Sequence, residues 1–161
     1  MKAKVAVYDS HEKAINAVKE LEFNGFPIKQ VSIIGKAEII DDNMRIKSRD
    51  TIENAPLAIG AIAGPVLGIL TGLGIFAIPG FGFLYGAGAV IGAIAGLDMG
   101  ALAGGFVSLM VILGVEEQEV VKYQEHIVKG NFLVMVQGNI HEIQQAEHIL
   151  HTSGTHLTWG N

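Results

Sequence analysis

Histidine side chains gather near the carboxyl end of the chain, where they could bind a metal ion. His141, Gln144, His148 and His151 share one face of the last expected helix. His148 and His151 are three positions apart, a spacing that brings two imidazoles together on a helix surface and suits shared metal ligation. No carboxylate at suitable spacing completes a site, so we expect a solvated polar face there.

A single carboxylate interrupts the most apolar part of the sequence. Residues 56–115 are sixty residues with one charge, that of Asp98. A charge in an apolar helix is costly unless it meets water, a neighbouring subunit or a proton. Asp98 is therefore a candidate contact with an ion or at a subunit interface. The alternative is a helix break or a cap at the end of a segment.

The residue combinations that common enzymes use do not occur in this sequence. There is no Ser-His-Asp or paired-carboxylate arrangement, and the glycine-rich stretches lack the lysine and the strand-turn-helix setting of a nucleotide-binding loop. The absence of cysteine excludes disulfides, thiolate metal sites and cysteine nucleophiles. We therefore expect neither catalysis nor a cofactor. The net charge of −5 also argues against nucleic acid as a partner.

Glycine recurs at every fourth position in two apolar stretches, which we call the glycine ladders. Glycine is less favourable than alanine in a water-exposed helix by about 0.8–1 kcal/mol. Its regular use therefore predicts close packing of helix backbones, as between transmembrane helices with small-residue stripes. The ladders consist of Gly60, Gly64, Gly68 and Gly72, and of Gly88, Gly92, Gly96, Gly100 and Gly104.

We predict that the two ladders belong to an apolar helical hairpin. Residues 57–77 are 21 uncharged residues, enough to cross a hydrocarbon core of roughly 30 Å. The sequence IPGFG at 78–82 predicts a turn, and residues 83–115 are apolar again. Basic residues flank the insert and are absent from the turn, which predicts that both flanks lie in the cytoplasm. The alternative is a soluble oligomer that buries the hairpins between subunits.

Each flank of the insert has the pattern of a strand, a helix and a second strand. An offset of 129 residues aligns Val5 with Val134 and Leu21 with Leu150, which supports two equivalent halves. Two such halves form a ferredoxin-like β-α-β-β-α-β arrangement. Neither half buries enough surface alone, so we expect them to pair across the insert.

Polar residues mark where the two main helices begin. Asp9 and Asn139 each precede an expected helix, and a glutamate follows three residues later in both, as Glu12 and Glu142. This pattern is typical of a capping box, in which the side chains satisfy the free N–H groups of the first turn.

These patterns define an α+β fold with an inserted segment. Residues 1–37 and 131–161 are the two halves of the ferredoxin-like domain, and residues 56–115 are the glycine-zipper hairpin. Residues 38–55 are polar and mixed in charge, which predicts a linker. Residues 116–130 have an acidic first turn and spaced apolar residues, which predicts a short amphipathic helix.

Several stretches together match a known pattern. They are VAVYDSHEKAINAVKELEFNGF at 5–26, AIPGFG at 77–82, the alternating Gly/Ala tract, and LGVEEQEVVKYQEHIVKGNFLVMVQG at 113–138. In these stretches the chain resembles the bacterial general stress proteins of the heat-induced, 17M-like group. The prolines that the family usually has after the IPGFG turn and in the GVEE segment are absent. The resemblance implies a stress-linked, membrane-associated protein and no catalytic residues.

The sequence thus predicts a non-enzymatic, self-associating stress protein that is attached to a lipid membrane, with both termini in the cytoplasm. Its expected partners are further copies of itself and lipid. One alternative is a small ion or proton conduit that forms by oligomerisation around Asp98. Another is a soluble cytoplasmic assembly or shell that buries the hairpins between subunits.

Overall fold

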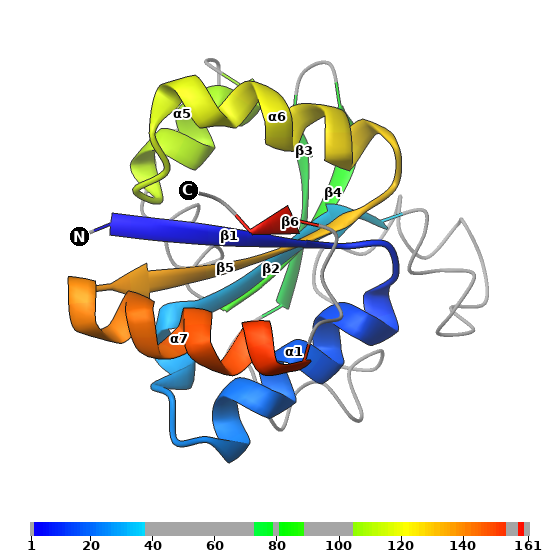
Figure 1. Cartoon of the computed structure of the whole chain (residues 1–161). Helices are drawn as coiled ribbons and strands as arrows, with labels where there is room; N and C mark the ends of the chain where they lie inside the picture. The colour runs from blue at the N-terminus through cyan, green and yellow to red at the C-terminus, as the bar shows by residue number, and fades with distance from the viewer. Residues whose placement is uncertain (1, 38–72, 79–80, 89–104, 154–157, 160–161) are drawn as a thin grey trace.

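The described part of the chain contains both helices and strands (Figure 1). A computed structural model describes residues 2–37, 73–78, 81–88, 105–153 and 158–159. The elements are β1 (Lys2–Tyr8), α1 (His11–Phe23), the 3₁₀ helix η1 (Ile28–Gln30), β2 (Val31–Lys36), β3 (Leu73–Ile78), β4 (Gly82–Gly88), α5 (Gly105–Ile112), α6 (Glu117–Val128), β5 (Phe132–Gly138), α7 (Ile140–Ser153) and β6 (Thr158–Trp159). The fold is α+β, as the sequence predicts.

The described strands form one sheet in the order β3-β4-β2-β5-β1-β6. Each pair of neighbouring strands is antiparallel. Strand β5 lies between β1 and β2, and β1 lies between β5 and β6. Strands from the two flanks of the insert therefore interleave, and the two flanks share one sheet.

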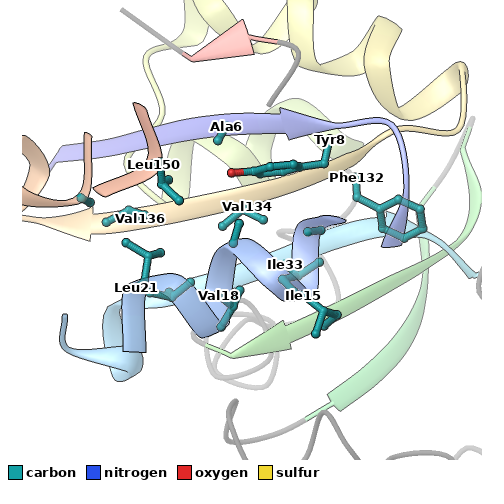
Figure 2. Close-up of a cluster of buried hydrophobic side chains, with 14 of the residues drawn as sticks. Ala6, Tyr8, Ile15, Val18, Leu21, Ile33, Phe132, Val134, Val136 and Leu150 are labelled. Atoms are coloured by element: carbon teal, nitrogen blue, oxygen red, sulfur yellow. The ribbon is translucent and has the colours of Figure 1, made fainter. Parts of the chain in front are cut away.

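Helices cover both faces of this sheet, α1 and α7 on one face and α5 and α6 on the other (Figure 1). The first core, between the sheet and α1 and α7, includes Tyr8, Leu21 and Phe132 (Figure 2). The second core, under α5 and α6, includes Phe106 and Leu109. Because both faces are covered, the central strands are apolar at nearly every position, and FLVMV in β5 is buried throughout.

The helix starts confirm one predicted cap and correct the other. Asn139 and Glu142 form the predicted reciprocal pair: the Asn139 N–H donates to Glu142 Oε2 at 2.7 Å, and the Glu142 N–H donates to Asn139 Oδ1 at 2.9 Å. At α1 the cap is Ser10, whose hydroxyl accepts from the Lys13 N–H at 3.3 Å. Asp9 lies one residue too early and instead forms an ion pair with Lys13 Nζ at 2.8 Å.

The predicted helical hairpin is wrong for residues 73–78 and 82–88, which form the strands of a β-hairpin. Its turn lies at the predicted IPGFG sequence, where the Phe81 N–H donates to the Ile78 carbonyl at 3.0 Å. The residues on both sides of this turn are rich in isoleucine and aromatic side chains, which favour strands over helices. The hairpin adds to the sheet through β4, which pairs with β2.

Gly88 shows what one ladder glycine does in this hairpin. It ends β4 with a φ of 82°, a conformation that favours glycine, and a Cβ at this position would collide with the Val31 carbonyl oxygen. Gly88 therefore allows a close approach of two strands, where the sequence predicts packing between helices. Asp98 and the other glycines of the ladders lie outside the described residues. These glycines are Gly60, Gly64, Gly68, Gly72, Gly92, Gly96, Gly100 and Gly104.

Two helices lie between β4 and β5 in the described residues, and the first, α5, falls within the predicted helical hairpin at 56–115. Helix α6 covers residues 117–128, within the predicted amphipathic helix at 116–130, and α5 precedes it. Of the helices that the structure describes, none is both long enough and apolar enough to cross a membrane. The predicted linker at 38–55 lies outside the described residues.

The 129-residue offset between the two halves holds for the helices and fails for the strands. Leu21 and Leu150 both lie in the first core. Val5 lies in the second core, however, while Val134 lies in the first. Two residues connect β1 to α1 and only one connects β5 to α7. This difference of one residue places the aligned strand positions on opposite faces of the sheet.

Replacement of Gly88 by alanine distinguishes the strand from the predicted helix. In a helix, Gly88→Ala would raise the free energy of unfolding by up to about 1 kcal/mol. In the structure it should lower that free energy by about 1–3 kcal/mol, because alanine is strained at positive φ and its Cβ meets the Val31 carbonyl. Urea denaturation measures the difference, and a more stable variant would contradict the strand.

Candidate functional site

A cavity of about 380 Å³ opens at the edge of the sheet beside the first residues of β1. Strand β6 pairs only with Ala6 and Val7, so on the side of β1 away from β5 no described strand pairs with the preceding residues. The turn between α5 and α6 closes the cavity on one side: the Ala3 N–H donates to the Gly114 carbonyl at 3.1 Å. The first turn of α6 and one face of α7 supply the remaining walls.

The walls of this cavity carry charges of both signs. Lys2 and Lys4 come from β1, Glu116 and Glu119 from the start of α6, and Glu147 from α7. The apolar part of the lining consists mainly of Ile140 and Ile143. None of the lining residues is a serine, threonine, cysteine, tyrosine or histidine. The ionisable groups that the cavity presents are the ammonium groups of lysine and the carboxylates of glutamate.

The predicted histidine face lies on α7. His151 Nε2 is 3.6 Å from Glu147 Oε1, so a charge interaction forms there when the imidazole is protonated. His148 lies one turn earlier on the same helix and is exposed. Within the described parts of the chain, no group of three or more histidine or carboxylate side chains is arranged to hold a metal ion.

A second cluster lies inside the first core and was not predicted from the sequence. We call it the aromatic row: Tyr85 on β4, Phe132 on β5 and Tyr8 on β1, with Gly35 on β2 between Tyr85 and Phe132. Tyr85 pairs with Gly35 and Phe132 pairs with Tyr8. Figure 2 shows Tyr8 and Phe132 on the face that α1 covers. The Phe132 ring occupies the space that a Cβ at Gly35 would need.

His11, the first residue of α1, covers this row. Its ring centroid is 5.4 Å from that of Tyr85 and 5.2 Å from that of Phe132. The side chain is 3% exposed. Within the described residues, neither His11 Nε2 nor the Tyr85 hydroxyl has a hydrogen-bond partner. Burial lowers the pKa of His11 and raises that of Tyr85.

One sequence signal could have located this buried imidazole. His11 precedes Ala14 and Ile15 by three and four positions, so it continues the apolar stripe of α1 at helical spacing. A polar residue on such a stripe is placed against the core by the helix itself. The identity of its neighbours depends on β4, which the sequence predicts to be helical.

Comparisons with known proteins add no relative to this description. Searches find no matching protein-family model, curated protein or solved structure. The resemblance to general stress proteins therefore stays a prediction from the quoted stretches, and the candidate sites rest on the geometry of the chain itself.

The aromatic row predicts that Gly35→Ala destabilises the protein. The new Cβ collides with the Phe132 ring, so we expect the free energy of unfolding to fall by about 1–3 kcal/mol. Phe132→Leu removes the ring edge and should relieve this collision. In urea denaturation, the double variant should therefore lose less stability than the sum of the two single losses. Additive losses would mean that the two residues do not interact.

Proposed function

We propose that this chain is a non-enzymatic, self-associating protein of the general stress type that attaches to one face of a lipid membrane. In this proposal a ferredoxin-like domain stays in the cytoplasm and carries two apolar, glycine-rich segments, residues 57–72 and 89–104. Attachment to one face replaces the membrane-crossing hairpin that the sequence alone predicts.

The observation that carries this proposal is the point at which the two segments join the domain. The first segment ends where β3 begins, and the second starts where β4 ends. Leu73, at the start of β3, pairs with Ala87, next to the end of β4. Both segments therefore reach the sheet at the same corner. This arrangement concentrates nearly uncharged sequence at one place, where it can pack together and enter a lipid surface.

Chain length favours attachment to one face over crossing. Residues 89–104 begin after β4 and end at α5, which packs on the same domain, since the Phe106 and Phe81 rings stack 5.0 Å apart. An excursion that crosses a bilayer and returns needs about 40 residues, at about 20 for each span. This segment has 16 residues, and the one between residues 37 and 73 has 35.

Two further features support the domain and its role. The interleaved order β2-β5-β1-β6, with α1 and α7 on the same face, agrees with two β-α-β halves that form a ferredoxin-like core. The stretches that resemble general stress proteins supply the expected physiological setting.

A charge placed in the first apolar segment tests the attachment to lipid. We expect the purified chain to float with vesicles of phosphatidylcholine and phosphatidylglycerol in a density gradient. Leu67→Asp should reduce the floating fraction about tenfold, because a carboxylate is costly in an apolar lipid layer. Phe23→Asp is the matched control: it adds the same charge and removes a side chain that is 90% exposed on α1, outside the segment in the sequence.

Two results would overturn the proposal. If Phe23→Asp lowers flotation as much as Leu67→Asp, net charge and not the segment governs vesicle binding. If the chain stays out of the vesicle fraction and sediments without detergent as a defined particle, the segments are buried between subunits of a soluble assembly.

A further inference from the structure

We propose that His11 is a proton-sensitive latch that holds the β3–β4 hairpin against the rest of the sheet. The neutral imidazole packs between Tyr85 of the hairpin and Phe132 of the central strand β5. Protonation of His11 then favours opening of the hairpin. This inference concerns the domain alone and does not depend on what the apolar segments contact.

The position of the hairpin makes local opening feasible. Strand β3 is the outermost described strand, and β4 joins the hairpin to the domain through its pairing with β2. Opening breaks that pairing, the contacts of Tyr85, the stacking of Phe81 on Phe106 and the burial of Ile78 and Leu84 in the second core, and it leaves the pairing of β1 with β5 intact. Local opening at the edge of a fold costs less free energy than unfolding of its centre.

The surroundings of His11 favour the neutral ring. The side chain is 3% exposed, and its Nε2 atom has no partner among the described residues. A charged imidazolium would need acceptors or water at both ring nitrogens. The first position of α1 also places the ring at the positive end of the helix dipole, which opposes a further positive charge. The faces of the neighbouring aromatic rings offset part of this cost.

Among the described residues, the charged and titratable groups near His11 do not supply a buried counterion. On its own helix and the preceding turn, Glu12 is exposed, and Asp9 and Lys13 pair with each other. The titratable neighbour on β4 is Tyr85, and the one on β1 is Tyr8; both are phenols.

From β5, Phe132 contributes no charge, and on β2 Gly35 is followed by Lys36. The Nζ of Lys36 donates to the Val128 carbonyl at 3.2 Å, at the C-terminal end of α6. Since no buried charge lies nearby among the described residues, the pKa of His11 is lowered by burial.

The direction of the pH effect follows from this lowered pKa. In the open hairpin the imidazole is solvated and takes up a proton near its ordinary pKa of about 6.5. In the closed hairpin it binds a proton only at lower pH. The open state therefore binds more protons in this window, so its equilibrium constant should rise about tenfold per pH unit below about 6.5, until the closed-state pKa is reached.

Amide hydrogen exchange of the full chain, measured between pH 7.5 and 5.5 and corrected for the intrinsic exchange rate, tests the latch. We expect the exchange of peptides that cover β4 to accelerate as the pH falls below about 6.5, by up to about tenfold per pH unit. Peptides that cover the centre of β5 should keep their protection. His11→Gln and His11→Phe both remove the titrating group and should flatten the pH dependence of β4. His148→Gln, which removes an exposed histidine of α7, should leave it as in the unmodified chain.

Two outcomes of the exchange experiment contradict the latch. If β4 and β5 lose protection together, protonation unfolds the whole domain. If the variants at His11 keep the steep pH dependence of the unmodified chain, another group titrates. If only one of the two variants folds, its pH dependence alone decides, because each lacks the imidazole.

Discussion

The ladder between β1 and β5 is the constraint on which the rest of the fold depends. It runs without interruption from the Lys2–Gly138 pair to the Tyr8–Phe132 pair, and it joins segments more than a hundred residues apart in the sequence. Such distant pairing costs chain entropy that only extensive burial offsets. Strand β5 from Phe132 to Val136 and β1 from Val5 to Tyr8 are buried on both faces, which supplies that burial. Every segment between them must therefore begin and end on this one sheet.

This constraint explains why helices cover two faces. The two flanks place α1 and α7 on one face of the sheet, and by themselves they leave Val5, Val7 and Leu133 uncovered on the other. Helices α5 and α6 supply the missing cover through Leu109, Met110 and Ile127. The residues from 105 to 128, which form α5 and α6, are thus part of the folding unit. The apolar sequence up to Val115 serves two purposes, since its last part belongs to the core of the domain.

The sequence predicts the flanks well because their signals are specific. A capping box at Asn139 and Glu142 has one structural meaning, and so does the stripe of apolar residues on α1. The four-residue spacing of the glycine ladders is not specific in this way. Residues four apart drift slowly around a helix, but they lie on one face of a strand as well, because four is a multiple of two. Glycine spacing alone therefore cannot distinguish a helix from a strand around Gly88, whereas the aromatic and isoleucine residues beside the turn favour the strand.

The candidate sites were harder to predict, because both depend on contacts between segments distant in sequence. The cavity needs β1, α6 and α7 together, and the environment of His11 needs β4, which was predicted to be helical.

The buried polar side chains lie beside one strand of the sheet. Among the described residues, the buried polar or charged side chains are His11 and Ser32. His11 contacts Tyr85, and Ser32 pairs with Gly88, so both adjoin β4. A buried polar group stabilises a fold only while its partners stay in place, and it destabilises the fold when they are lost. The pairing of β4 with β2 is therefore the part of the described sheet that adjoins its buried polar side chains. The pairing of β1 with β5 is apolar on both faces from Val5 to Tyr8, and there it depends mainly on burial.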